Sequence, residues 1–391
     1  MGRVTQHGDN LSISAELVDV RDNSRIWGEQ YSRRLSDILQ VQAEISREIS
    51  DKLRLKLTGE EQELVAKRYT ESAEAYQLYL KGRFYWNKRN EESLKRGIDY
   101  FQQAIDKDPN FALAYTGLAD SYSALGSVAI SGLPPREAMV KMKFAAQKAL
   151  ELDDTLAEAH TSLADARFRG DWDWPGAERE FRRALELKPN YAEGHAWYSQ
   201  YLVAMGRFEE SIAEGKRAQE LDPVSPSISR TLGFDYYFAR RYDQAVEEYQ
   251  RALELDPNFF FAHWLLGLAY ARQSMFEQAI AESRKAVELS GHGPGALGGL
   301  GYVYAVSGRR DEARQVLDEL KELAKRRYVS PNSVAAIYSL LGEKDAAFEW
   351  LERAYRDGAY GMLFLKVAPE WDGLRSEPRF QDGMQRVGLP Q

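Results

Sequence analysis

The chain has 391 residues, a net charge of −8 and no cysteine. This length suits two or more domains or one long repeat array, and the acidic balance argues against a nucleic-acid partner bound through a general basic field. The lack of cysteine excludes disulfides, thiolate metal sites and cysteine nucleophiles. No basic and apolar leader follows Met1, and the longest apolar stretch, 259–271, is too short to cross a bilayer, so we expect a soluble chain without a signal peptide or a membrane span.

The first 60 residues favour a small α/β unit. Residues 11–20 alternate apolar and polar side chains as a strand does, residues 21–25 have turn composition, and residues 26–32 predict a return strand. Ser36 is the expected N-cap of a helix that continues to Gly59, with apolar residues at helical spacing. A hairpin with one helix is marginal by itself, so this unit either packs on the rest of the chain or lacks part of its sheet.

From about residue 73 the sequence repeats itself every 34 residues. Four ladders share this register: Pro189, Pro223 and Pro257; the small residues at 177, 211, 245, 279, 313 and 347; Tyr236, Tyr270, Tyr304 and Tyr338; Gly233, Gly267 and Gly301. Each unit is expected to hold two amphipathic helices, with small residues where they approach and a proline that ends the second helix. Because one unit cannot bury its apolar face alone, the units must stack into a solenoid.

The spacing and residue types of these ladders resemble the tetratricopeptide repeat family. The resemblance implies an all-α, right-handed superhelix of about eight helix hairpins over residues 73–357, joined to the α/β unit by a linker at 61–72. The second repeat carries an insertion of roughly ten residues, "GSVAISGLPPRE". Residues 358–391 break the pattern, and we expect them to cap the last apolar face.

The segments "GRVTQHGDNLSISAELVDV" and "IWGEQYSRRLSDILQVQAEIS" resemble the last half of a TolB-like α/β domain. In bacterial multidomain signalling proteins this domain precedes tetratricopeptide arrays. Its upstream neighbours in that family are serine/threonine kinase, winged-helix DNA-binding or nucleotide cyclase domains. The sequence contains neither the first half of the α/β domain nor an effector domain, so none of these activities is carried over to this chain.

Three motifs are candidates for chemistry. His160, His195 and His263 share one repeat position, but consecutive repeats lie on the order of 10 Å apart, too far to share a metal, so we expect a packing role. "GPGALG" at 293–298 matches a dinucleotide-binding pattern but follows a helix and not a strand, which favours a thin helix. "VAPEW" at 367–371 resembles the A-P-E motif of protein kinases, but the sequence lacks the other motifs that a kinase needs. We therefore predict no catalytic residue, no metal and no cofactor, and a chain that is not an enzyme.

The resemblance also implies which residues face the concave side of the superhelix. In the middle repeats these are Trp197, Arg230, Phe234, Tyr237, Phe238, Phe261, Trp264, Leu268, Arg272 and Tyr302. Because aromatic groups with arginine are favoured anchors, we expect this stripe to hold a peptide or protein segment across repeats four to seven. Two alternatives stay open: the aromatics pack among themselves and on adjacent repeats, or they join copies of the chain in a homo-oligomer.

The sequence thus predicts a non-catalytic protein-interaction scaffold, the sensory or docking part of a bacterial signalling protein. The alternative is the C-terminal fragment of a serine/threonine kinase or of a winged-helix transcriptional regulator whose effector domain lies upstream. The expected location is cytoplasmic, or extracytoplasmic if the parent protein carries a membrane span upstream. The clamp that some relatives use for a carboxy-terminal carboxylate is not indicated, because no repeat has the asparagine it requires.

Overall fold

The computed structural model describes residues 2–18, 25–34, 37, 40–41, 44–45, 48, 69–128 and 130–389. At the N-terminus, β1 (Gly2–His7), β2 (Asn10–Val18) and β3 (Arg25–Arg34) form an antiparallel sheet in the order β1-β2-β3. The predicted hairpin of β2 and β3 is confirmed, whereas β1 was not predicted. Its signal was the two-residue turn Gly8–Asp9, where Gly8 has φ of +58°.

A small apolar cluster joins this sheet to the next segment of the chain. Trp27 and Tyr31 of β3 are buried together with Val41, and Ile45 packs against them. Val41 and Ile45 belong to the helix predicted for 36–59, and most of that range lies outside the described residues. Trp27 and Tyr31 of β3 therefore lie on its covered face, whereas Ile26 is 46% exposed.

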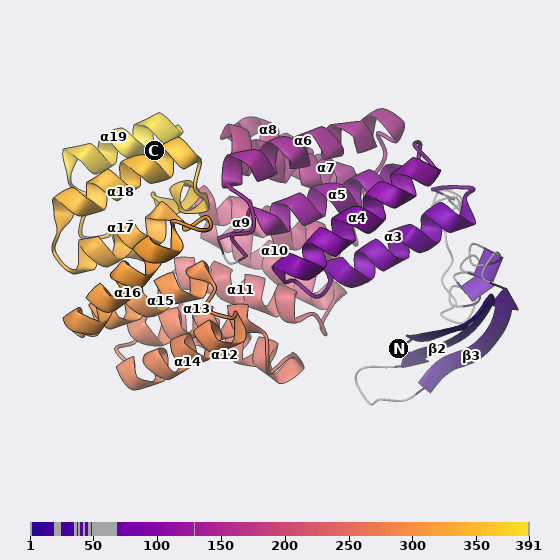
Figure 1. Cartoon of the computed structure of the whole chain (residues 1–391), viewed down its shortest axis with the longest axis horizontal. Helices are drawn as coiled ribbons and strands as arrows, with labels where there is room; N and C mark the ends of the chain where they lie inside the picture. The colour runs from indigo at the N-terminus through magenta and orange to yellow at the C-terminus, as the bar shows by residue number, and fades with distance from the viewer. Residues whose placement is uncertain are drawn as a thin grey trace.

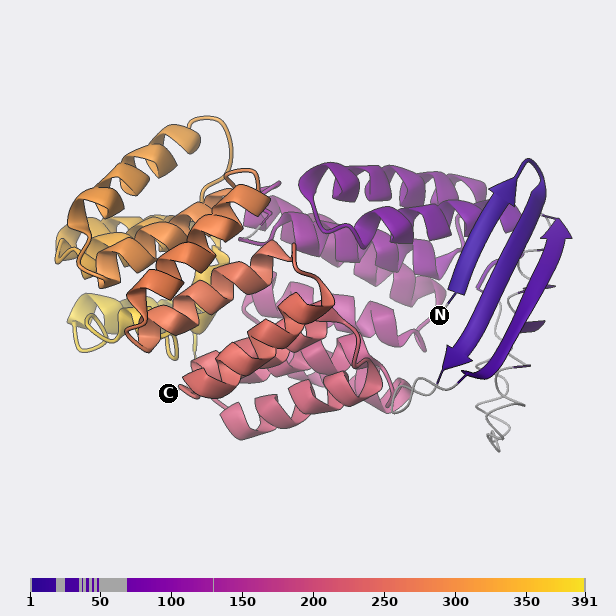
Figure 2. The same ribbon diagram turned by 90° about the horizontal axis from the view of Figure 1, so that it is seen from below.

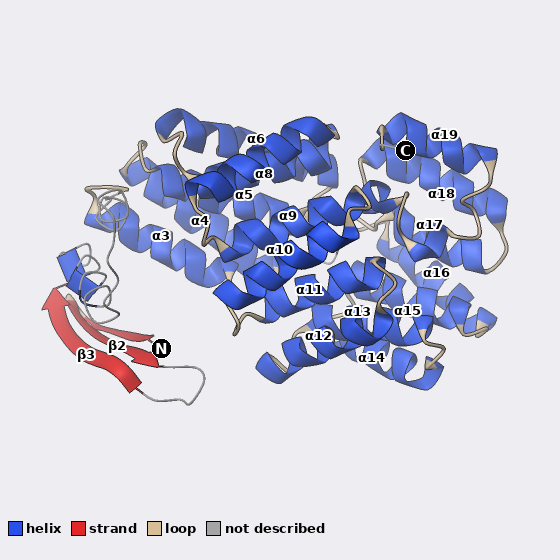
Figure 3. Cartoon of the chain, turned by 180° about the vertical axis from the view of Figure 1, so that it is seen from behind, coloured by secondary structure: helices blue, strands red, loops and turns tan. Residues whose placement is uncertain are grey.

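Eight helix pairs come next, as the 34-residue register predicts (Figures 1 and 3). The pairs are α3 (Ala73–Trp86) and α4 (Glu91–Lys107); α5 (Ala112–Leu125) and α6 (Pro135–Leu152); α7 (Ala157–Ala166) and α8 (Trp174–Leu187); α9 (Ala192–Ala204) and α10 (Phe208–Leu221); α11 (Pro226–Phe238) and α12 (Tyr242–Leu255); α13 (Phe260–Arg272) and α14 (Phe276–Leu289); α15 (Pro294–Val306) and α16 (Arg310–Leu323); α17 (Pro331–Leu340) and α18 (Lys344–Asp357). A π-helical turn, η2 (Arg167–Asp171), extends α7.

The helix ends result from local chemistry. Ser72 accepts a hydrogen bond from the backbone N–H of Ala75 at 3.1 Å, which caps α3, and Ser225 caps α11 in the same way. The helix α12 ends at Leu255, and Pro257 stands two residues later, where a proline cannot continue a helix. The local sequence therefore determines that a charged second helix ends at a proline and is followed by an aromatic first helix.

The two helices of a pair approach closely at the predicted glycines. A Cβ on Gly233 would lie 2.6 Å from the ring of Tyr249, and a Cβ on Gly267 would lie 2.4 Å from Oγ of Ser283. Ala279, on the small-residue ladder, is fully buried opposite. The ladders therefore mark the contact between paired helices, as the sequence predicted.

The C-terminal segment (residues 358–389) consists of η3 (Tyr360–Phe364), η4 (Pro369–Trp371) and α19 (Pro378–Val387). Its helix α19 packs on α18, where Arg386 pairs with Glu352 at 2.7 Å. Its first half turns inward and reaches distant repeats. Arg240 forms two hydrogen bonds to Asp372, at 2.7 and 2.8 Å. The segment therefore does more than cover the last repeat: it also joins the last repeat to the fifth.

The last repeats also contact the first repeats. Nε of Arg136 donates to the carbonyl of Arg356 at 2.6 Å. Arg327 donates to Glu91 and to the carbonyl of Ile130, both at 3.0 Å. In Figure 1 the orange and yellow helices lie beside the purple ones, and Figure 2 shows the same path from below. The superhelix thus closes on itself. Over the described ranges, none of the helices is long and apolar enough to cross a membrane.

Candidate functional site

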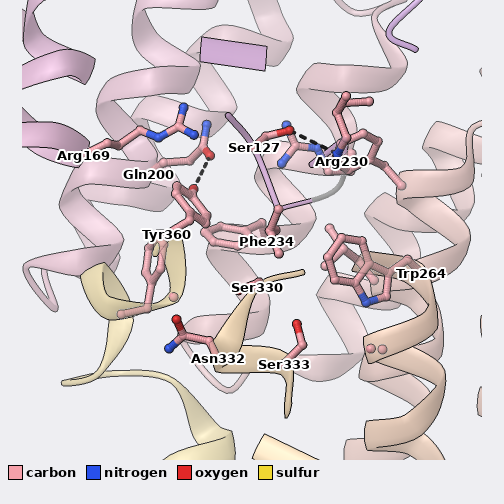
Figure 4. Close-up of a pocket in the computed structure, with 18 of the residues that line it drawn as sticks. Ser127, Arg169, Gln200, Arg230, Phe234, Trp264, Ser330, Asn332, Ser333 and Tyr360 are labelled. Atoms are coloured by element: carbon pink, nitrogen blue, oxygen red, sulfur yellow. Dashed lines mark hydrogen bonds between the residues drawn. The ribbon is translucent and has the colours of Figure 1, made fainter. Parts of the chain in front are cut away.

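A pocket of about 320 Å³ lies on the inner side of the closed superhelix. First helices of the repeats supply one part of its wall, and the C-terminal segment supplies another. Figure 4 shows Arg230, Phe234 and Trp264 around this space, with Tyr360 and Asn332 across from them. A volume of this size accepts a small molecule or one or two side chains of a protein segment.

Nine of the ten residues predicted for the concave groove line this pocket: Trp197, Arg230, Phe234, Tyr237, Phe238, Phe261, Trp264, Leu268 and Tyr302. The tenth, Arg272, lies behind the wall, with its guanidinium 5.5 Å from the ring centroid of Tyr302. Four successive first helices, α9, α11, α13 and α15, carry these residues. The structure thus brings the predicted residues together, and the binding of a segment by them stays a prediction.

The expected open groove is partly filled by the chain itself. The ring of Phe364, in η3, lies 5.4 Å from Phe234 and 5.1 Å from Phe238, measured between centroids. Phe234 and Phe238 are consequently buried, at 9% and 7% exposure. The sequence could not show this, because residues 358–391 carry no repeat register that would assign them a place. A partner would meet only what the C-terminal segment leaves accessible.

The accessible part of the stripe is centred on α13. Phe261, Trp264 and Leu268 are only half-buried, and the rings of Phe261 and Trp264 lie 6.4 Å apart. Trp264 reaches its place because Gly299 has no side chain: a Cβ there would lie 2.1 Å from the indole Nε1. The "GPGALG" stretch opens α15 after the helix α14, and Gly299, which follows it directly, makes this helix thin where the indole packs, as expected.

Two arginines of the pocket wall each lie near an aromatic ring. Arg89, in the turn after α3, stacks on Trp86 with 3.5 Å between its guanidinium carbon and the ring centroid, and Arg230 lies 5.9 Å from the ring of Phe261. Burial lowers the pKa of both, that of Arg89 to about 10, and the charge of Arg230 adds to the shift of Arg89. Both remain cations at neutral pH. Within the part of the chain that the structure describes, neither guanidinium makes a hydrogen bond or an ion pair.

Three other charged groups on the wall, Asp120, Asp165 and Arg169, have partners. Asp165 pairs with Arg169 at 3.0 Å and accepts a hydrogen bond from Ser123 at 2.8 Å. Asp120 pairs with Arg83 at 3.1 Å, and burial outweighs this pairing and raises the pKa of Asp120 to about 6. Asp120 and Asp165, on the first helices of repeats two and three, are therefore both paired with arginines.

Sequence reasoning missed several residues of the pocket. Tyr360 donates to Oε1 of Gln200 at 3.2 Å, and Glu370 lies near Arg272, whose charge opposes the rise that burial causes in the pKa of Glu370. Arg89 has a positive φ of 51°, in a turn outside the repeat ladders. None of these residues has a signal in the 34-residue register, so only the folded chain assigns them to the pocket. Among the described residues, no group of three or more histidine or acidic side chains is placed to hold a metal.

The comparisons with known proteins concern the repeats. Family models described as tetratricopeptide repeat match residues 163–226 and 262–292, and one described as TPR repeat matches residues 235–274. Putative adenylate cyclase 3 of Rhizobium meliloti (strain 1021) is 28% identical over 170 residues, which are 42% of this chain and 28% of that protein. Superkiller protein 3 of Schizosaccharomyces pombe (strain 972) is 28% identical over 171 residues, 42% of this chain and 11% of that protein.

This chain thus spans less than a third of the length of either curated relative. Among solved structures, PilF of Pseudomonas aeruginosa is 23% identical, covers 54% of this chain and 94% of its own, and has a TM-score of 0.39. The family models fall on the repeats whose register is regular, between α7 and α14. These matches, together with the 34-residue register and the packed helix pairs of the described residues, show that the chain contains tetratricopeptide repeats.

Proposed function

We propose that this chain is a non-catalytic interaction scaffold that holds a peptide or protein segment in the pocket on its concave side. The observation that carries the proposal is the pocket of about 320 Å³ whose wall contains nine of the ten residues predicted for binding. Half-buried Phe261, Trp264 and Leu268 offer the large apolar surface that protein interfaces use as anchors. One or two side chains of the partner would enter the pocket, and the rest of the segment would lie over its rim.

A signalling role is the second part of the proposal. It is supported by the resemblance of the first 60 residues to a TolB-like domain and by the name of one relative, a putative adenylate cyclase. That name belongs to a protein of which this chain spans 28%, so the cyclase chemistry belongs to that protein. For this chain we propose the docking part of such a system, without an activity of its own.

The test is a peptide-display selection on the purified full chain, followed by affinity measurement on the selected peptides. Selected peptides are expected to bind with micromolar dissociation constants, and Trp264→Ala is expected to weaken them by about thirtyfold, since a hot-spot residue contributes about 2 kcal/mol or more. Phe144→Ala is the matched control, because Phe144 is 64% exposed on α6 and is not part of the pocket wall.

Two outcomes would contradict the proposal. One is a selection that enriches no peptide above background. The other is a set of peptides that bind the Trp264→Ala chain as tightly as the wild-type chain, with circular dichroism showing that both are folded. Phe234 is a poor choice for this experiment, because its contact with Phe364 makes it part of the core.

A further inference from the structure

The N-terminus of α17 forms part of the pocket wall. Ser330 is the N-cap residue of this helix, and Ser330, Asn332 and Ser333 all line the pocket. The first backbone N–H groups of a helix have no partner inside the helix. In α17 the N–H of Ser333 bonds to the carbonyl of Ser330 at 3.2 Å, whereas that of Asn332 has no partner among the described residues. The side chain of Ser330 does not cap the helix, although serine is a common cap.

Buried side chains at this helix end also lack partners. Ser330 and Asn332 are 4% and 7% exposed. Across the described ranges, neither the hydroxyl of Ser330 nor Oδ1 of Asn332 forms a hydrogen bond, and Nδ2 of Asn332 meets only the weak acceptor Sδ of Met362, at 3.7 Å. Figure 4 shows the oxygen atoms of Asn332 and Ser333 directed toward the side of the pocket where Phe234 lies. Because buried polar groups are nearly always paired, these indicate a place where a ligand supplies the partners.

Two glycines of the pocket lining give these polar side chains their room. A Cβ on Gly298 would lie 2.7 Å from Cβ of Ser333, and a Cβ on Gly361 would lie 2.5 Å from Cγ of Asn332. Since neither glycine has a side chain, Ser333 and Asn332 can reach the wall. The polar corner at α17 is thus built from α15, α17 and η3 together.

The charges on the pocket wall balance. Its lining holds three carboxylates and three guanidinium groups: Asp120, Asp165, Glu370, Arg89, Arg169 and Arg230. A charged anchor would give the occupied pocket a net charge, and burying an uncompensated ion is costly. The wall therefore favours an uncharged anchor, which the unpaired donors and the unpaired acceptor at α17 recognise through hydrogen bonds.

Resting on the proposed function, we propose that the anchor of the partner is a primary carboxamide, the side chain of a glutamine or an asparagine in the bound segment. Its carbonyl oxygen accepts hydrogen bonds from the N–H of Asn332 and from the hydroxyl of Ser330 or Ser333, and its NH2 group donates to Oδ1 of Asn332. A carboxylate of the same shape has no hydrogen to donate to Oδ1. An amine has no oxygen to accept from the donors.

The first experiment titrates three probes of similar shape into the full chain, followed by ligand-observed NMR. Benzamide is the amide, benzoate has a second acceptor oxygen in place of the NH2 group, and acetophenone has a methyl group there. Benzamide is expected to bind the wild-type chain about fivefold more tightly than either of the others, the contribution of one hydrogen bond.

Two variants assign the two halves of the amide. Asn332→Leu is expected to weaken benzamide by about fivefold and to leave acetophenone within about twofold, because only benzamide uses Oδ1. Ser333→Ala is expected to weaken both probes alike by about threefold, because both use a carbonyl oxygen. Asn258→Leu is the matched control, since Asn258 is exposed and lies outside the lining, and it is expected to change neither probe.

Thermal unfolding distinguishes recognition from a structural role. Asn332→Leu removes a buried oxygen that has no partner, so the melting temperature is expected to stay the same or to rise. A lower melting temperature would show that the fold itself uses this amide, and the inference would be overturned.

The second experiment uses the peptides selected for the proposed function, which are expected to share a glutamine or an asparagine. Replacing that residue by its acid is expected to weaken binding to the wild-type chain by about fivefold, and to change binding to the Asn332→Leu chain by less than about twofold.

The outcomes separate the two proposals. If benzoate or acetophenone binds the wild-type chain as tightly as benzamide, or if Asn332→Leu changes neither probe, the inference is overturned. If benzamide is preferred but no peptide is selected, the proposed function fails, while the carboxamide site stands with a free small amide as its ligand. If the selected peptides contain neither glutamine nor asparagine, the proposed function stands and the inference is overturned.

Discussion

Three histidines at the fourth position of a first helix form one recurring contact. In each, Nδ1 meets a glutamate of the paired helix, and Nε2 meets the backbone carbonyl at the end of the preceding repeat. Nδ1 of His160 lies 2.7 Å from Glu180, and its Nε2 lies 2.9 Å from the carbonyl of Asp154. The equivalent partners are Glu214 and the Pro189 carbonyl for His195, and Glu282 and the Pro257 carbonyl for His263. These histidines therefore make polar contacts in addition to the packing contacts that were expected.

This geometry selects the charged form of the ring. Both acceptors are oxygens, so both hydrogen bonds form only when both ring nitrogens carry a proton. Burial lowers the pKa of His195, but the hydrogen bonds to Glu214 and to the Pro189 carbonyl outweigh it, and the pKa ends above its ordinary value near 6.5. His160 and His263 shift in the same direction for the same reasons.

The stability of the array should therefore decrease as the pH rises above neutrality. A pKa raised by folding means that the contribution is complete below about pH 6.5 and is lost as the pH passes the folded pKa. We expect His195→Gln to lower the free energy of unfolding by about 1–2 kcal/mol at pH 6, and by less at pH 8.5. Chemical denaturation at the two pH values measures this. His292→Gln is the control, because that side chain is 70% exposed. An equal loss at both pH values would contradict the imidazolium assignment.

At the scale of the helix pair, the repeat glycines are needed for space. A Cβ on Gly267 would lie 3.0 Å from the backbone oxygen of Ala279, and a helix backbone cannot move aside as a side chain can. On α19, by contrast, a Cβ on Gly383 would have no neighbour within 4 Å. Both glycines lie inside helices, where alanine has the higher helix propensity by about 1 kcal/mol. Alanine substitutions at the two positions therefore separate the effect of packing on stability from the effect of helix propensity.

We expect Gly267→Ala to destabilise the chain by about 1–2 kcal/mol, because the cost of overpacking exceeds the gain in propensity. The expected effect of Gly383→Ala has the opposite sign, a stabilisation of about 0.5–1 kcal/mol. Thermal unfolding followed by circular dichroism compares the two variants with the wild-type chain. If both raise the melting temperature, the helices of the sixth pair are not in close contact at Gly267.

At the scale of the whole molecule, the C-terminal segment connects parts that the repeat register keeps apart. Phe364 is 3% exposed, and its ring contacts two rings of α11, three repeats before the last one. Lys366 donates to the carbonyl of Met205 at 3.4 Å, at the end of α9. Such contacts make the unfolding of the middle repeats depend on a segment that lies beyond the array in sequence.

We expect Phe364→Ala to lower the free energy of unfolding by about 3–5 kcal/mol, the usual cost of removing a buried ring. Phe144→Ala should stay within about 0.5 kcal/mol of the wild-type chain, because its ring is 64% exposed. Hydrogen exchange adds a readout specific to this contact: amides of α11 should lose protection in Phe364→Ala together with those of the C-terminal segment. Unchanged protection of α11 would show that the segment folds independently of the groove.

The sequence alone determined the repeat unit. A proline every 34 residues, glycines where paired helices meet and alternating residues in β2 act within a few residues or between adjacent helices, so their spacing predicts the elements. The same helical geometry explains why nine predicted groove residues share one pocket: side chains at equivalent repeat positions point to one side of a solenoid.

Only the tertiary structure decided what the pocket is. The rotation from one repeat to the next is small but adds up over eight helix pairs, and this sum brings Arg327 to Glu91. No periodic pattern in the sequence predicts this accumulated rotation. The insertion of η3 beside Phe234 and the meeting of Arg89 with Arg230 at one wall result from the same closure. Local spacing thus specified the units and their inward faces, and long-range packing turned an open groove into a small pocket with two half-buried arginines on its wall.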